Sequence, residues 1–331
     1  MPGFEITDTN IELSRWDAMT LRRAINSAKL EELQQPAVGT ALGILLLNLT
    51  SIVLLIAAAK FAALWWVTAL VVVLIAGRQH AMLVMMHEAA HGMLHKVRWV
   101  NDLVSNLFLT FPLFMSTALY RAHHLQHHRY VNTDRDPDLN DSELPPNGLL
   151  FLLQLFGDLL GLRSLRMLTS INDFGVFGLF SKNLNKTTVL RREQWLFVGV
   201  ALLVLAILTF TGAWLEVLIF WIVPMWFILP PVLHLRAVAE HAGRVDADYE
   251  AHARSVDPYP LERLLICPLN INLHLEHHIF PDIPAHRLPQ VSRLLADIPS
   301  LGTKLRRNRG YLLGRNSVLA ELYAPKQQVR T

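Results

Sequence analysis

Four long apolar stretches stand out in the pattern of hydrophobic and polar positions along the chain. Residues 37–59 contain no charged side chain and are long enough to cross about 30 Å of hydrocarbon as a helix. Lys60 interrupts this stretch, and a second one, 61–86, resumes at once. The third and fourth stretches cover 195–214 and 217–235, and prolines predict bends in the fourth. We therefore predict an all-α integral membrane protein with four transmembrane helices.

Two weaker apolar segments lie between the second and third predicted helices. Leu103–Tyr120 is uncharged, but Pro112 interrupts it and Asn, Thr and Ser side chains dilute it. Leu149–Leu160 contains Asp158. We expect both segments to lie in the membrane interface or to enter it part-way, rather than to cross it.

Basic residues indicate how the predicted helices are oriented. Arg and Lys precede the first and third stretches and follow the fourth, whereas the two opposite loops offer only Lys60. Because cytosolic loops are enriched in Lys and Arg, we place both termini and the long middle segment in the cytosol. The predicted organisation is a cytosolic segment over 1–36, a membrane domain with a cytosolic helical cap over 37–300, and a basic cytosolic tail over 301–331.

The composition agrees with a membrane protein and excludes several other classes. Hydrophobic residues make up 52% of the chain and charged residues 17%, which is more apolar than a typical soluble domain. The net charge of +3 is small, so nucleic acid is not an expected partner. A single cysteine, Cys267, excludes an intrachain disulfide and a cysteine-ligated iron–sulfur cluster. We expect it to be a packing residue.

The candidate chemistry lies in three short histidine boxes among the 15 histidines of the chain. "HEAAH" begins at residue 87, "HLQHH" at residue 124 and "HLEHH" at residue 274. Residues i and i+3 or i+4 of a helix share one face, so each box can aim at least two imidazoles at one point. The adjacent histidine of an H-x-x-H-H box points about 100° away and can reach a second metal beside the first.

"HEAAH" alone has a second interpretation. It matches the zinc-protease signature in which two histidines hold the metal and Glu88 is the base. That interpretation needs a third ligand from elsewhere and leaves both H-x-x-H-H boxes unexplained. Eight imidazoles exceed the four ligands of one tetrahedral zinc and suit two metal ions with positions left for oxygen. Imidazole binds Zn, Cu, Fe and Ni alike, so the ligand type does not name the metal.

The three boxes, their order and their spacing resemble the membrane fatty acid desaturase superfamily of di-iron, oxygen-activating enzymes. The resemblance extends from about Val38 to Pro289 and includes "HHRYVNTDRDPDL" after the second box and "NINLHLEHHIFPDIPAHRLPQ" around the third. It implies a further ligand in "AEHAG". A metal-coordinating asparagine of some members has no clear match, and Asn270 and Asn272 are the only stand-ins. The ligands that the resemblance implies are His87, His91, His124, His127, His128, His241, His274, His277 and His278.

Carboxylates near the boxes are candidates to support the ligands rather than to bind metal, because metal-bound imidazoles usually donate their other N–H to a carboxylate or carbonyl. These candidates are Glu88, Asp136, Asp138, Glu240 and Glu276. Among the other histidines, we expect His80 and His234 to be buried and hydrogen-bonded. The remaining four are expected at the surface or behind the ligands: His95, His123, His252 and His286.

By this resemblance the chain is expected to be a membrane desaturase that uses two Fe ions and O2 to introduce a double bond into a fatty acyl lipid. A methylene group has no polar handle, so metal and oxygen must do the chemistry. The sequence contains no haem-domain or dinucleotide-binding motif, which implies an external ferredoxin-like or haem-type electron donor with its reductase. Basic tail residues could contact that donor or the membrane lipid headgroups: Lys304, Arg306, Arg307 and Arg309. A related hydroxylase or ketolase acting on a carotenoid or another apolar lipid remains an alternative, and the zinc protease a remote one.

Overall fold

The computed structural model describes residues 21–23, 25–170, 175–181, 187–242, 253–297 and 307–324. Four helices in these ranges are long and apolar enough to cross a membrane: Ser27–Ala62, Trp65–Ala90, Thr188–Thr211 and Trp214–His241. The predicted helical class and the four spans are thereby confirmed in number and order. The structure contains no membrane, so the cytosolic cap stays a prediction.

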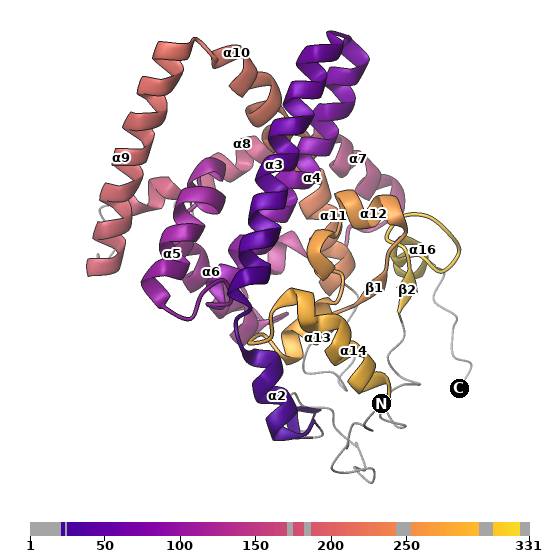
Figure 1. The fold of residues 1–331 in the computed structure, drawn as a ribbon. Helices are drawn as coiled ribbons and strands as arrows, with labels where there is room; N and C mark the ends of the chain where they lie inside the picture. Colours follow the sequence, from indigo (N-terminus) through magenta and orange to yellow (C-terminus); the bar gives the residue numbers. More distant parts are fainter. Residues whose placement is uncertain are drawn as a thin grey trace.

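The first two spans, α3 (Val38–Ala62) and α4 (Trp65–Ala90), form an antiparallel hairpin. The turn lies at Ala63, which has a positive φ of 52°, rather than at Lys60 as the charge pattern suggested. Lys60 remains inside α3, where its ammonium reaches Glu216 of the other helical pair at 2.6 Å. The two interhelical turns therefore lie at the same end of the molecule (Figure 1).

The second pair consists of α9 (Thr188–Thr211) and a composite helix that runs to His241. The composite helix contains α10 (Trp214–Val217), two π-helical turns (Leu218–Ile222 and Pro224–Ile228) and α11 (Leu229–His241). Pro224 is the first residue of the second π-turn, and the two turns are the irregularity that the prolines predicted. In α9 only Glu193 is buried, so most of this helix stands apart from the others (Figure 1).

The segment between the first two boxes reverses direction instead of continuing as one long helix. It consists of α5 (Arg98–Ser105), a π-turn (Asn106–Thr110), a 3-10 turn (Phe111–Leu113) and α6 (Thr117–Tyr130), with a positive φ of 58° at Phe114. Its polar residues hold the reversal together. Thr117 Oγ1 bonds Ser105 Oγ at 2.8 Å, and Thr110 Oγ1 bonds the Asn106 side chain at 3.0 Å. The polar residues that weaken the apolar pattern of this segment thus fix the turn that brings α6 back beside α4.

The remaining elements lie beside the middle of the long helices or at the end of the molecule opposite the two interhelical turns (Figure 1). The described helices are α2 (Ser27–Gln34), α7 (Gly148–Leu159), α8 (Leu162–Ser170), α12 (Pro260–Leu265), α13 (His274–Ile279), α14 (Leu288–Ala296) and α16 (Val318–Leu322). Short 3-10 turns cover Leu139–Asp141, Val176–Phe180, Pro268–Asn270 and Ala285–Arg287. In the described ranges the strands β1 (Val256–Asp257) and β2 (Asn308–Arg309) form one short parallel pair.

Two apolar clusters attach these elements to the long helices. One joins Leu33 of α2 to α13 and α14 through residues such as Phe280 and Leu288. The other packs Tyr311 and Val318 against Val238 of α11. Cys267 is fully buried in the second cluster, in agreement with its expected packing role. Residues 307–324 are thus part of the body that carries the boxes.

Candidate metal centre

The first box lies at the C-terminal end of α4, where the last carbonyls of a helix lack the i+4 N–H donors of its interior. Arg121 of α6 supplies donors to them: its Nε bonds the carbonyl of Ala90 at 2.9 Å and its Nη2 that of Ala89 at 2.8 Å. The side chain of Asn101 also donates to the Ala89 carbonyl, at 2.9 Å. These bonds fix the end of α4, and with it His87 and His91, relative to the second box.

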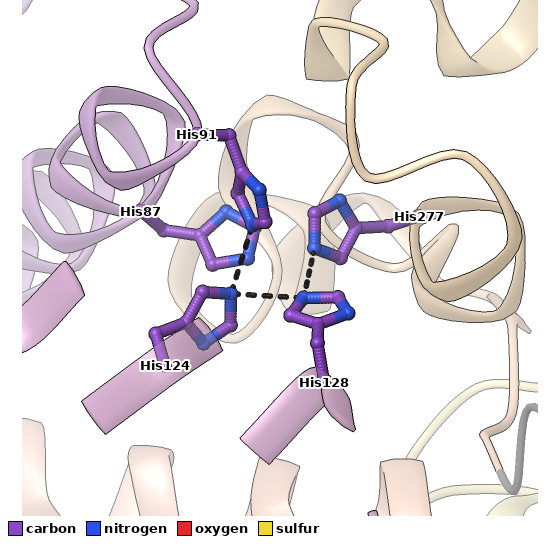
Figure 2. Close-up of side chains that lie close together, drawn as sticks. All are labelled: His87, His91, His124, His128 and His277. Carbon is purple, nitrogen blue, oxygen red and sulfur yellow. Dashed lines mark hydrogen bonds between the residues drawn. The ribbon is translucent and has the colours of Figure 1, made fainter. Parts of the chain in front are cut away.

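Five imidazoles converge at the first point of the site (Figure 2). They come from all three boxes: His87, His91, His124, His128 and His277. The Nε2 atom of His124 lies 3.0 Å from those of both His91 and His128, and His128 Nε2 lies 3.0 Å from that of His277. One potential ligand atom from each of the five lies within 4.8 Å of all the others.

Four imidazoles converge at a second, adjacent point: His127, His241, His274 and His278. The Nε2 atom of His274 lies 2.9 Å from that of His241 and 3.1 Å from that of His278. The rings of His128 and His278 are 4.4 Å apart, which places the two clusters side by side. All nine expected histidines, including the isolated His241, therefore fall into these two clusters.

The donor set fits metal ions. Burial lowers the pKa of His91 to about 4 and that of His128 to about 2. Burial and neighbouring imidazoles lower the pKa of His277 well below its usual value. Neutral imidazole is the metal-binding form. Among the residues that the structure describes, both ring nitrogens of His87 and Nδ1 of His274 are buried without a hydrogen-bond partner. Such an arrangement is costly for polar atoms, and a bound cation would relieve it.

The five candidate carboxylates behave differently from one another. Asp136 accepts a hydrogen bond from Nδ1 of His127 at 2.8 Å, which leaves Nε2 of that ring with a lone pair. Asp138 instead bonds His123, at 2.7 Å, and stays 3.6 Å from His127.

The three glutamates have other partners. Glu88 accepts the backbone N–H of Ala285 at 2.8 Å, Glu240 forms a two-pronged pair with Arg236, and Glu276 contacts Ser255 and Arg307. Glu240 also lies 3.7 Å from Nε2 of His274. Among the five, Asp136 is the one with a hydrogen bond to a clustered imidazole.

The other histidines have partners of their own. His80 is fully buried, with Nδ1 3.1 Å from the Leu265 carbonyl and Nε2 2.9 Å from Arg236. His234 bonds Asp158 at 2.6 Å. Both are the buried, hydrogen-bonded residues that the sequence predicts. His95 contacts the backbone of Val97. His286 is half-buried, and His252 lies outside the described residues.

Two arginines that support the site are not obvious from the sequence. In the sequence, Arg121 and Arg236 look like ordinary basic residues outside the apolar stretches. Arg236 is used there only to predict the orientation of the fourth helix. The spacing does contain a signal for their supporting role. Arg121 lies three residues before His124, and Arg236 lies four residues before Glu240, so each arginine shares a helical face with a residue of the site. Of the tail residues, Arg307 binds Glu276 and Arg309 lies over the Tyr259 ring at 5.0 Å. Lys304 and Arg306 lie outside the described residues.

An apolar cavity of about 590 Å³ reaches both clusters. Leu83, Met86 and Trp226 are among its apolar walls, and His87, His124 and His241 line the end at the histidine clusters. The volume lies within the range of small-molecule sites, about 300–1,000 Å³. Such a wall selects an apolar ligand, because it offers few hydrogen-bond partners.

Comparison with known proteins agrees with this geometry. The fatty acid desaturase family model matches residues 63–307, most of the chain and all nine clustered histidines. The chain belongs to the fatty acid desaturase family. As a member of this family, the chain is an oxidoreductase of lipid metabolism.

Two curated relatives of this desaturase-family chain are named desaturases. The chain is 27% identical over 241 residues to the dihydrorhizobitoxine desaturase of Bradyrhizobium elkanii, which covers 68% of this chain and 67% of that protein. It is 28% identical over 222 residues to the sn-1 oleoyl-lipid 12-desaturase of Synechocystis sp., which covers 62% of this chain and 61% of that protein. The two names specify different substrates, dihydrorhizobitoxine and an oleoyl lipid.

Proposed function

We propose that the protein is a membrane-bound, di-iron, O2-dependent desaturase that introduces a double bond into a fatty acyl chain. The observation that carries the proposal is the apolar cavity that ends against two clusters of imidazoles. A cavity of this kind favours an acyl chain over a small polar compound. We propose the nine clustered histidines as the ligands and the cytosolic side as the location of the site and both termini.

The two irons, when bound, would supply the oxidising power that removes hydrogen from an unactivated methylene. The overall reaction balances when two hydrogens removed from the substrate chain, two donor electrons and two protons reduce O2 to two water molecules, leaving the alkene as product. The proposal therefore includes an external ferredoxin-like or haem-type donor with its reductase.

The protein's own residues would position the metals and the chain. Asp136 holds Nδ1–H of His127, so that Nε2 offers its lone pair to the four-imidazole cluster. Arg121 fixes the end of α4 and thereby the first box. The apolar wall keeps bulk water away from the reacting carbon.

The alternative interpretations differ in their support. A zinc protease would use Glu88 as a base, but this carboxylate is buried and accepts the N–H of Ala285. A hydroxylase or ketolase would use the same clusters and cavity, and only the product distinguishes it from a desaturase.

The test combines metal and product analysis of one preparation. About two irons per chain are expected, and a saturated acyl substrate should yield an alkene with loss of two hydrogens. His278→Ala should lower bound iron and abolish product. A hydroxylated product would favour the alternative oxygenase, one zinc without redox activity the protease, and full activity of His278→Ala would remove the third box from the site.

A further inference from the structure

A second cavity, of about 780 Å³, adjoins the apolar one and has no part in the proposed chemistry. The chain around Pro137–Pro146, helix α7 and helix α8 form its walls. Four residues line both cavities: His123, Asp138, Asp141 and Arg163. A single elongated ligand could therefore extend from one cavity into the other.

The walls of this second cavity mix polar and apolar side chains, with a larger polar share than in the apolar cavity, and carry no excess of positive charge. Carboxylates line it at Asp138, Asp141, Glu143 and Asp158, and guanidinium groups at Arg163 and Arg166. Four negative and two positive groups give −2 with both lining histidines neutral, and zero with both charged. Three of the carboxylates already have a partner: Asp141 bonds Arg163 at 2.6 Å, Asp158 bonds His234 at 2.6 Å, and Asp138 bonds His123 at 2.7 Å. Glu143 is exposed and makes no hydrogen bond or ion pair within the described ranges.

We propose that this cavity binds the polar head of the substrate, and that this head carries hydrogen-bond donors and no net negative charge. The inference rests on the proposed function, because it assumes that the acyl chain fills the apolar cavity. Carboxylates only accept hydrogen bonds, so they suit hydroxyl groups such as those of a glycosyl head. The same charges disfavour the phosphates of coenzyme A, a phosphatidylglycerol head and a free carboxylate.

Glu143 is the residue through which this preference can be altered. It lines the cavity without an internal partner, so reversing its charge breaks no described ion pair. Glu143→Lys raises the net charge of the cavity lining by two units, so this variant should bind anionic head groups better. Glu31→Lys is a matched control, because Glu31 is exposed on α2, away from the cavity, and the change in total charge is the same.

The experiment compares monogalactosyl diacylglycerol, phosphatidylglycerol and acyl-CoA with one acyl chain in the same micelles. Desaturation is measured as kcat/KM, and binding of the radiolabelled lipids is measured on metal-free protein. The glycosyl lipid should be preferred at least ten-fold in both measurements. Glu143→Lys should shift that preference at least five-fold toward acyl-CoA, mainly through KM, and Glu143→Gln should shift it less in the same direction. Glu31→Lys should leave it unchanged.

The two measurements separate this inference from the proposed function. Equal or tighter binding of acyl-CoA by the unaltered protein, or an unchanged preference in Glu143→Lys, would overturn the head-group inference even if desaturation proceeds. Selective binding of the glycosyl lipid without desaturation of any substrate would support the polar cavity and count against the proposed function.

Discussion

Replacing Asp136 by Asn tests how the protein supports one metal position without touching a proposed ligand. The Asp136 carboxylate accepts from His127 Nδ1 at 2.8 Å and from the backbone N–H groups of Asn132 and Asp138 at 2.9 Å. Burial raises the pKa of Asp136, but these donors outweigh it and hold the pKa below its ordinary value. The group is therefore an anion that fixes both the aim and the tautomer of His127.

Asparagine keeps the size of the side chain but loses the charge. Removing such a support typically costs about 10- to 100-fold in metal affinity, which corresponds to about 1.4–2.7 kcal/mol. The loss should fall on the four-imidazole cluster, because that is the one of the two imidazole clusters to which His127 belongs. Asp136→Asn should therefore release about one of two metals when dialysed against graded chelator, and the second metal should behave as in the unaltered protein.

Asp134→Asn is the matched control, because Asp134 is exposed two residues away and makes no hydrogen bond within the described ranges. Metal content by elemental analysis and product formation should both be unchanged in it. The reasoning fails if Asp136→Asn keeps both metals at chelator concentrations that leave the control intact, or if it loses both metals together.

Three further predictions address the electron supply, the buried thiol and the topology. Purified protein with substrate and O2 alone should form no product, and adding a reductase and ferredoxin should start turnover; sustained turnover without a donor would contradict the redox assignment. Burial raises the pKa of Cys267 to about 12, so its reactive thiolate is scarce at neutral pH and forms only as the pH rises toward that value. An impermeant maleimide at pH 7 should therefore label Cys267 after denaturation but not before, and rapid native labelling would show that the thiol is accessible. Because Cys267 should not label in the native protein, single cysteines can be introduced beside it. Cysteines that replace Lys96 and Asp134 should label from the cytosolic side, and one that replaces Phe61 should label from the other side. Labelling of positions 96 and 134 from opposite sides would make a common site impossible.

The spans were predictable because long uncharged runs satisfy a simple length criterion. The ends of the spans were less predictable, because a lysine can remain inside a helix when it has an ion-pair partner. Lys60 does this through Glu216, 156 residues away, a contact that no local pattern contains. Likewise, the polar residues of 103–120 predicted that this segment does not cross, but only the structure shows that they bond one another to close a turn.

The candidate carboxylates also differ in how far the sequence could predict their role. Glu276 follows His274 by two residues, so helix geometry turns it about 200° away from that ring, and it binds Ser255 and Arg307 instead. Its exclusion could have been derived from the sequence. Asp136 could not have been chosen over Asp138 in this way, because both lie in an irregular segment where spacing does not determine direction.

The unequal number of imidazoles in the two clusters follows from helix geometry and one residue. In each H-x-x-H-H box the i and i+4 histidines belong to one cluster and the i+3 histidine belongs to the other. The i and i+4 histidines of the second box are in the five-imidazole cluster, and those of the third box are in the four-imidazole cluster. This exchange alone gives each cluster three imidazoles. α4 then adds a pair, His87 and His91, to the first cluster, whereas α11 adds only His241 to the second. Four residues before His241 the chain has Ala237, where a histidine would have completed a matching pair. Ala237 lines the apolar cavity. In the four-imidazole cluster, the position where a fifth histidine would stand is therefore a small residue that faces the proposed substrate.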